Sequence, residues 1–249
     1  MAKHAVVDPL VQHAGACLAI GRRNAEFYRF HGAAEQRIVE APYCVDNDYF
    51  ARFSLGMAVR DGLLRSVGLD PGKPTILFAA KLIPRKRPLD VVEAHRLMER
   101  RANLVVVGDG ALRGVLSQSV GDHPSERLLG FKNQSELGRW YAAADIFVLP
   151  SEFERWGLAV NEAMAAGAVP VVSDVVGCAP DLVEPGGGRT FPVGDVSRLA
   201  QVLDELTADE ALLARLRTRG RELIEQHSIN SSAAGFERGV EVAVGTHQA

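Results

Sequence analysis

Short apolar runs alternate with amphipathic helical patterns through most of this 249-residue chain. The segment at 89–100, for example, places Val91, Ala94 and Met98 at positions i, i+3 and i+7, which is the spacing of one helix face. The apolar runs are nearly uninterrupted, so both faces of each predicted strand must be covered, as in parallel sheets. We therefore predict an α/β fold, a Rossmann-like parallel sheet with helices on both faces. The predicted strands are 75–79, 104–107, 127–129, 146–149 and 169–172.

The two ends of the chain carry further elements. An apolar run at 17–21 predicts a strand, 22–31 predicts a helix, and 38–45 is expected to be extended. Residues 46–50 have the composition of a turn. Closing helices are predicted at 199–206, 211–225 and 230–244. The last of these carries an apolar stripe of Phe236, Val240 and Val244.

Charge, cysteine content and hydropathy exclude several functional classes. The net charge of −3 gives no electrostatic basis for binding nucleic acid. The three cysteines contain no C-x-x-C pair, which argues against a zinc site and a disulfide framework. The first residues lack the apolar segment of a signal peptide, and no apolar run reaches transmembrane length. We expect a cytoplasmic protein, with peripheral association at a membrane as an alternative.

The stretch at 150–170 combines a helix N-terminus with two carboxylates. Glu154 lies in the loop that leaves a predicted strand, and Gly157 allows a tight turn into a helix at 158–166. Glu162 follows about two turns into that helix. A helix N-terminus after a strand suits phosphate, whereas carboxylates accept hydrogen bonds from hydroxyls. The arrangement therefore predicts a ligand with phosphate in the middle and sugars at both ends.

This stretch resembles the E-x7-E signature of group 1 (family 4-type) GT-B glycosyltransferases, which use nucleotide sugars. Five flanking blocks resemble the same family in the same order, at 78–88, 104–112, 137–151, 171–177 and 191–200. The resemblance implies the nucleotide-sugar-binding half of a retaining glycosyltransferase. It also implies three parts: a remnant of the N-terminal domain and linker at 1–50, the donor-binding domain at 51–228, and a crossing helix and tail at 229–249.

The resemblance assigns roles to several residues. Glu162 would accept hydrogen bonds from the ribose hydroxyls, and Glu154 would contact the donor sugar and stabilise charge at the anomeric carbon. Lys81 and Lys86 match the basic pair that neutralises the diphosphate. The family usually has glycine where this chain has Ala80 and Arg87, which removes backbone freedom at both positions.

Further positions complete the predicted donor site. Gly108 would line the nucleotide cleft, and the loop containing Phe131 would hold the base through its backbone. Gly157 and Leu158 would present the helix N-terminus to the diphosphate. The segment 46–48 imitates a D-x-D metal motif, but its place before an aromatic residue fits a turn or a helix cap. We predict no metal site and no cofactor apart from the donor substrate.

The resemblance also implies that most of an acceptor-binding domain is absent from this chain. We expect self-association or a protein partner carrying such a domain, and little sugar transfer by this chain alone. Two other functions stay open. The chain could be a non-catalytic or partner-dependent nucleotide-sugar-binding module, or a nucleotide-sugar epimerase of the same fold.

Overall fold

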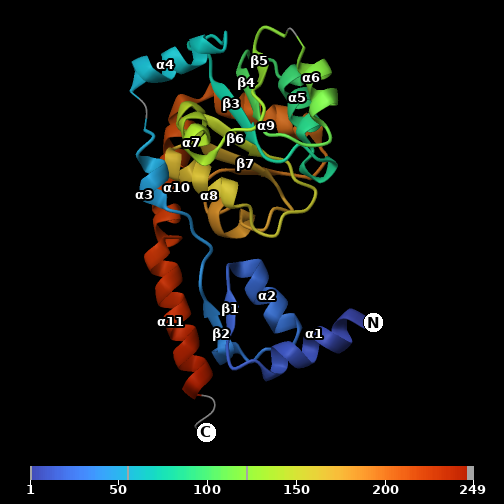
Figure 1. Cartoon of the computed structure of the whole chain (residues 1–249), viewed down its shortest axis with the longest axis vertical. Coiled ribbons are helices and arrows are strands. Elements are labelled where there is room, and N and C mark those ends of the chain that lie inside the picture. The colour runs from blue at the N-terminus through green and yellow to red at the C-terminus, as the bar shows by residue number, and fades with distance from the viewer. Residues whose placement is uncertain (1, 55, 122, 246–249) are drawn as a thin grey trace. The chain divides into compact units, whose positions relative to one another are not determined.

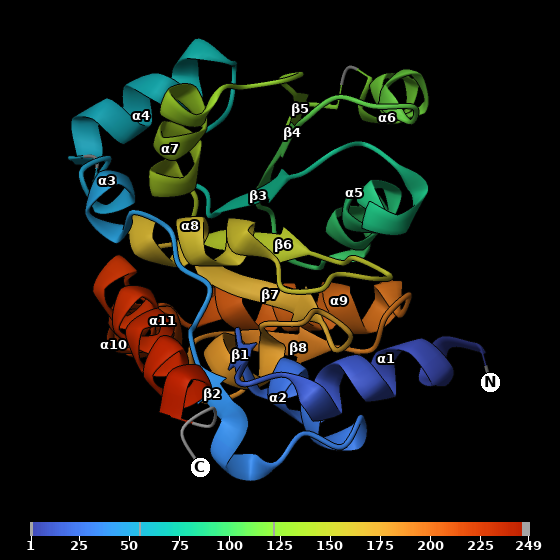
Figure 2. The ribbon, with the colours of Figure 1, turned by 60° about the horizontal axis from the view of Figure 1, so that its bottom comes forward.

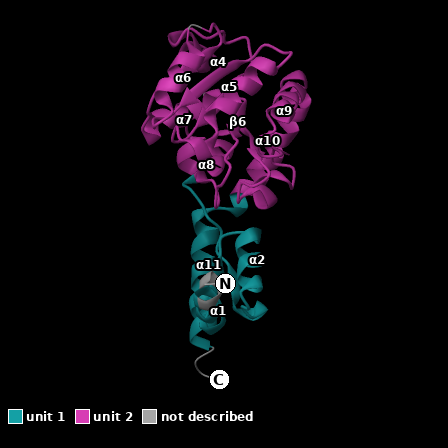
Figure 3. Cartoon of the chain, turned by 90° about the vertical axis from the view of Figure 1, so that its right-hand side faces the viewer, with its two compact units in different colours: residues 1–46, 225–249 teal, residues 47–224 magenta. Residues whose placement is uncertain are grey.

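The computed structural model describes residues 2–54, 56–121 and 123–245. The chain divides into two compact units (Figure 1, Figure 3). Unit 1 comprises Met1–Asp46 and Glu225–Ala249, and unit 2 comprises Asn47–Ile224. None of the helices in the described part of the chain is long and apolar enough to cross a membrane.

Unit 2 is built on a six-stranded sheet in which every neighbouring pair of strands is parallel. The strands follow the order β5-β4-β3-β6-β7-β8 across the sheet (Figure 2). This is the order of a doubly wound nucleotide-binding fold, with the first strand of the unit, β3, in the centre. The strands are β3 (Thr75–Ala79), β4 (Asn103–Val107), β5 (Glu126–Leu128), β6 (Ile146–Leu149), β7 (Val169–Ser173) and β8 (Arg189–Phe191).

Helices connect and cover these strands. Unit 2 also contains two short helical turns, a 3-10 turn at Pro84–Lys86 and a π-helical turn at Ala179–Val183. The helices of unit 2 are α3 (Asn47–Ala51), α4 (Met57–Ser66), α5 (Pro88–Leu97), α6 (Arg113–Val120), α7 (Gln134–Ala143), α8 (Leu158–Ala166), α9 (Val196–Ala208) and α10 (Glu210–Gln226).

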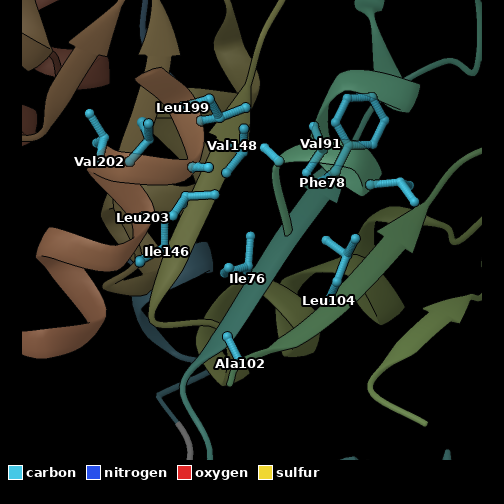
Figure 4. Packing of buried hydrophobic residues seen from close by; sticks show 14 of the residues in the cluster. Ile76, Phe78, Val91, Ala102, Leu104, Ile146, Val148, Leu199, Val202 and Leu203 are labelled. Atoms are coloured by element: carbon cyan, nitrogen blue, oxygen red, sulfur yellow. The ribbon is translucent and has the colours of Figure 1, made fainter. Parts of the chain in front are cut away.

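Alternate residues of the strands form two buried faces. One face carries Ile76, Leu104 and Ile146, which pack with Val91 of α5 and Leu203 of α9 (Figure 4). The other face lies against α7 and α8, where the ring of Tyr141 contacts that of Phe147 on β6. Because both faces are buried, the central strands β3, β4 and β6 are mainly apolar. The predicted fold class is therefore confirmed.

Most predicted elements are observed, with shifts at their ends. The strands predicted at 75–79 and 146–149 have the predicted bounds, and the helix predicted at 89–100 ends at Leu97. The prediction of a turn at 46–50 was wrong, because residues 47–51 form helix α3. Its Phe50 is fully buried, and the side chain of Asn47 donates a hydrogen bond to the carbonyl of Ile224. Tertiary packing thus stabilises a helix whose local composition favours a turn.

Unit 1 joins the start of the chain to its last helix. It contains α1 (Ala2–His13), β1 (Cys17–Ala19), α2 (Arg22–Phe30), a 3-10 turn at Glu35–Arg37, β2 (Ile38–Glu40) and α11 (Ile229–Gly245). β1 and β2 pair in parallel as a two-stranded sheet. Helix α11 packs on this sheet through Gly235 and Gly239, where added Cβ atoms would lie 2.2 Å from Glu40 O and 2.4 Å from Leu18 Cδ2. The glycines allow this close approach of helix and sheet.

A buried carboxylate at the amino end of β5 joins that edge strand to α5. Glu126 is fully buried and accepts hydrogen bonds from His95 Nδ1 at 3.0 Å and from Arg96 Nη2 at 2.8 Å. Burial opposes its ionisation, but these two partners outweigh burial, and the pKa of Glu126 is lowered. A carboxylate that is neutralised in this way fixes the edge of the sheet at the end opposite the carboxyl ends of the strands.

Arg87 has a left-handed backbone conformation just before α5. Its φ is 49°, and among the described residues no other non-glycine residue has a positive φ. Its side chain donates to Asp90 Oδ2 at 2.6 Å in the first turn of α5. Of the two positions where the resemblance implies glycine, the one at Arg87 has the conformation that glycine adopts most easily, whereas Ala80 has an ordinary backbone conformation. The strain at Arg87 is of the order of 1–2 kcal/mol.

We predict that Arg87→Gly is more stable to unfolding than Arg87→Ala by about 1 kcal/mol. Both changes remove the bond to Asp90, so the two variants differ in the backbone cost of the left-handed conformation. Urea denaturation followed by circular dichroism measures the difference. An Arg87→Ala protein as stable as Arg87→Gly, or more so, would contradict this account.

Candidate functional site

The carboxyl edge of the sheet has a natural opening next to β3. The chain proceeds from β3 to β4 on one side, and later returns to place β6 on the other side of β3. In doubly wound sheets the crevice at such a reversal is where ligands bind. The loops that follow β3, β4, β5 and β6 meet at this edge, and all predicted site residues lie in these loops or at the start of α8.

Backbone hydrogen bonds hold the first three of these loops together. Leu82 N donates to Asp109 O at 2.9 Å, and Leu112 N donates to Leu82 O at 2.9 Å. Gly108 N donates to Gly130 O, also at 2.9 Å. A Cβ at Gly108 would lie only 1.9 Å from Ala80 O, and φ at this glycine is 144°. Glycine at position 108 is therefore required for the close approach of the loops after β3 and β4.

These loops, helix α7 and the first turns of α8 line a pocket of about 630 Å³. Four predicted site residues line it, Lys81, Gly108, Phe131 and Glu162. Three lining residues that the sequence analysis missed are Asp109, Lys132 and Tyr141. The other lining residues are Ala79, Ala80, Val107, Gly110, Leu137 and Ala159. The walls combine apolar surface with a few charged groups, as expected of a site for a nucleotide.

Glu162 presents its carboxylate to this pocket from α8. Its Oε2 accepts a hydrogen bond from the hydroxyl of Tyr141 at 2.9 Å. Burial raises the pKa of Glu162, and the bond from Tyr141 lowers it in part, with a net increase. A half-buried carboxylate with one oxygen engaged retains acceptor capacity for ligand hydroxyls.

Lys81 and Phe131 differ from Glu162 in exposure. Phe131 is 72% exposed, which leaves its ring free to cover a planar ligand at the pocket wall. Lys81 is exposed, and no ion pair involving it occurs among the described residues. An unpaired ammonium at the rim of a pocket is suited to a phosphate group.

Glu154 and Lys86 lie outside the lining of the pocket and form an ion pair with each other. Both side chains are largely buried. The loops that carry them are joined, because Glu152 N donates to Arg85 O at 2.8 Å and Arg85 Nη1 donates to Phe153 O at 3.1 Å. The structure thus brings the first carboxylate of the E-x7-E pattern and one member of the predicted basic pair into direct contact.

Gly157 and Leu158 form the start of α8, as predicted. Gly157 caps the helix with a φ of 105°, and the indole of Trp156 donates to Asn161 Oδ1 at 2.9 Å within the first turns. A second loop supports this entry, since Gly177 N donates to Glu154 O at 2.9 Å. A Cβ at Gly177 would lie 1.8 Å from Arg155 O, so this contact also depends on glycine. The N-terminus of α8 is therefore held in place next to Glu154. The N–H groups of the first turn of a helix have no acceptor within the helix.

Comparison with known proteins identifies the family. A family model described as "Glycosyl transferases group 1" matches residues 60–223, more than half of the chain. The chain is 30% identical over 255 residues to a D-inositol 3-phosphate glycosyltransferase of Xylanimonas cellulosilytica, a match that covers 92% of this chain and 57% of that protein. It is 34% identical over 203 residues to D-inositol 3-phosphate glycosyltransferase 2 of Catenulispora acidiphila, covering 75% and 46%. The chain thus spans about half the length of these relatives.

Solved structures share the fold. HepE of Anabaena in complex with UDP superimposes with a TM-score of 0.82 at 18% identity, over 94% of this chain and 66% of that one. Sucrose-phosphate synthase from Thermosynechococcus elongatus superimposes with a TM-score of 0.77 at 20% identity, over 100% and 62%. The residues matched by the family model fall within unit 2, which carries the pocket. The sequence match and the shared fold lead to one conclusion: this chain belongs to the group 1 glycosyltransferases.

Proposed function

We propose that this chain binds the nucleotide-sugar donor of a retaining glycosyl transfer. The observation that carries the proposal is the pocket at the carboxyl edge of the sheet, whose lining includes Lys81 and, from the first two turns of α8, Ala159 and Glu162. These groups match the parts of a nucleoside diphosphate. A carboxylate accepts from the ribose hydroxyls, while an ammonium and a helix N-terminus neutralise the diphosphate.

In the proposed complex the donor extends from the pocket toward Glu154. The base lies in the pocket near Phe131 and the Gly108 loop, and the ribose meets Glu162. The diphosphate lies at Gly157–Leu158 with Lys81, and the sugar reaches the Glu154–Lys86 pair. Proteins with this fold have been solved with UDP and with UDP-glucose bound, which supports a ligand of this class.

The proposed reaction breaks the bond between the anomeric carbon and the terminal phosphate oxygen. A hydroxyl oxygen of the acceptor forms the new bond to that carbon, its proton leaves, and the nucleoside diphosphate departs as an anion. Positive charge develops on the sugar and negative charge on the diphosphate. Glu154 stabilises the former, and Lys81, Lys86 and the helix N-terminus stabilise the latter. Because these groups supply the neutralising charge, we propose that the transfer needs no metal ion.

Two other functions share the same donor site. An epimerase would change the configuration of the donor sugar without transferring it, and a binding module would leave the donor unchanged. Nuclear magnetic resonance of a nucleotide sugar incubated with the protein distinguishes them, because a new sugar isomer appears only with the epimerase. The curated relatives bear the names of glycosyltransferases, which favours transfer.

We predict that the purified chain binds a nucleoside diphosphate from a panel of UDP, GDP and ADP. Glu162→Ala should weaken this binding by about 1–3 kcal/mol and should weaken binding of the parent nucleoside similarly, because the ribose bonds are lost. Lys81→Ala should weaken only the diphosphate, because its charge meets phosphate. Titration calorimetry measures both ligands.

Two variants serve as controls. Lys73→Ala is matched to Lys81→Ala, because Lys73 lies just before β3 and Lys81 just after it. Glu93→Ala is matched to Glu162→Ala and removes an exposed carboxylate from α5. Both should bind like the wild type. Folded wild-type protein that binds none of the three diphosphates would refute the proposed function. Equal losses for nucleoside and diphosphate in Lys81→Ala would refute the role of Lys81.

We also propose that unit 1 meets a further domain that binds the acceptor. Its helix α11 packs on β1 and β2 through glycines, while the predicted stripe of Phe236, Val240 and Val244 is 60%, 55% and 54% exposed. A hollow of about 680 Å³ along this helix is mainly apolar and includes Cys44, Ile229 and Phe236. An apolar helix face of this kind is typical of a protein interface.

We therefore predict that the isolated chain self-associates through this face and transfers little or no sugar unaided, because the proposed further domain would be needed to orient the acceptor and exclude water. Multi-angle light scattering after size exclusion measures its mass, and Phe236→Glu should shift it to the monomer. Activity of a monomeric wild-type chain on its own would show that the proposal is wrong.

A further inference from the structure

The hydroxyl of Tyr141 has an unusual place in the donor pocket. Tyr141 lies on α7 and is only 1% exposed, yet it lines the pocket together with Glu162. Its hydroxyl donates to Glu162 Oε2 at 2.9 Å. A buried tyrosine hydroxyl needs a hydrogen-bond partner, and the partner here is the carboxylate to which the proposed function assigns the ribose.

Two aromatic neighbours hold the ring of Tyr141 in place. Phe147 on β6 lies 5.6 Å from it, centroid to centroid, and Phe50 on α3 lies 6.1 Å from it, both with an interplanar angle of 74°. These edge-to-face contacts fix the ring on two sides. The direction of the hydroxyl is therefore set by the core of unit 2, and the orientation of the Glu162 carboxylate follows from it.

Burial raises the pKa of Tyr141 well above its usual value, and the charge of Glu162 raises it further. The hydroxyl therefore keeps its proton and acts as a donor. It engages Oε2, so Oε1 and the remaining acceptor position of Oε2 can be aligned with a pair of neighbouring hydroxyls. A carboxylate without this restraint would rotate between several orientations.

We propose that Tyr141 is a positioning residue that fixes the Glu162 carboxylate for a ribose diol, and so makes the site select ribonucleotides over 2′-deoxyribonucleotides. This inference rests on the proposed function of the pocket. It assigns a specificity to the α7–α8 pair, since a 2′-deoxyribose leaves one prepared acceptor position without a donor. An acceptor that the bound ligand shields from water but leaves without a donor lowers affinity.

The test compares Tyr141→Phe with the wild type, using UDP, GDP or ADP, whichever binds tightest, and its 2′-deoxy form. We expect the wild type to favour the ribose form by about tenfold. Tyr141→Phe should lose most of this preference through weaker binding of the ribose form, while its affinity for the 2′-deoxy form changes little. The matched control is Tyr28→Phe, which removes a hydroxyl that donates to Leu18 O at 3.2 Å in unit 1.

The pH dependence gives a second readout that a purely structural role would not move. Glu162 accepts best when ionised, so binding of the ribose form weakens as pH falls through its pKa, which burial raises above its ordinary value. The bond from Tyr141 lowers that pKa, so its removal should shift the loss of binding to higher pH. The other titratable groups that line the pocket, Lys81, Asp109 and Lys132, are the same in both proteins, and the 2′-deoxy ligand controls for phosphate titration.

The outcomes separate this inference from the proposed function. Wild-type protein that binds no nucleoside diphosphate overturns both. The inference alone is overturned if the wild type binds but Tyr141→Phe keeps its preference for the ribose form. It is likewise overturned if Tyr141→Phe loses affinity for both ligands equally. If thermal melting shows that Tyr141→Phe does not fold, Phe50→Leu loosens the ring while keeping the hydroxyl. Phe50→Leu should then reduce the ribose preference in the same way, and an unchanged preference overturns the inference.

Discussion

Burial of both faces of the six-stranded sheet is the constraint on which the rest of unit 2 depends. Alternate residues of β3 and β6 face opposite helix layers, and both sets are inaccessible to solvent. A polar group on such strands is costly when it lacks a partner. Chemistry is therefore confined to the two edges of the sheet. The reversal of strand order beside β3 opens the carboxyl edge, where the loops diverge and leave room for a ligand.

The loops at this edge form a supported site, not a set of independent segments. Gly108 and Gly177 allow backbones to approach at distances that any Cβ would prevent. The Lys86–Glu154 pair joins the loop after β3 to the loop after β6. Tyr141 packs against a buried aromatic ring and donates its hydroxyl to Glu162. Glu162 and the Lys86–Glu154 pair are thus each held by specific contacts, which is how a rigid scaffold preorganises binding.

Much of this arrangement could be predicted from local sequence patterns. Residues 75–79 and 146–149 have the predicted bounds because each is a short run rich in apolar and β-branched residues with a proline at one end, which favours a buried strand. Gly157 and Gly167 bracket α8 at the predicted positions, because left-handed caps favour glycine. In contrast, β8 is three residues long and contains Arg189 and Thr190, so its pattern is too short and too polar to be recognised. Helix α3 depends on the burial of Phe50 against distant segments.

The site contained contacts that sequence alone could not reveal. Tyr141 and Glu162 are separated by 21 positions, and Lys86 and Glu154 by 68. Their proximity follows from the order of the strands. Tyr141 in particular lies among apolar residues of α7, where it has the pattern of a core residue. Only its hydrogen bond to Glu162 points to the proposed second role.

Hydrogen exchange of the backbone amides tests the central claim most directly, that the carboxyl edge beside β3 is the nucleotide site. Exchange is compared with and without saturating nucleoside diphosphate. The account predicts slower exchange at 80–87, 108–112, 129–133 and 156–162, with no change in the amino-edge segments 71–74 and 123–125. Protection at the amino edge, or unchanged exchange at the carboxyl edge despite binding, would contradict it.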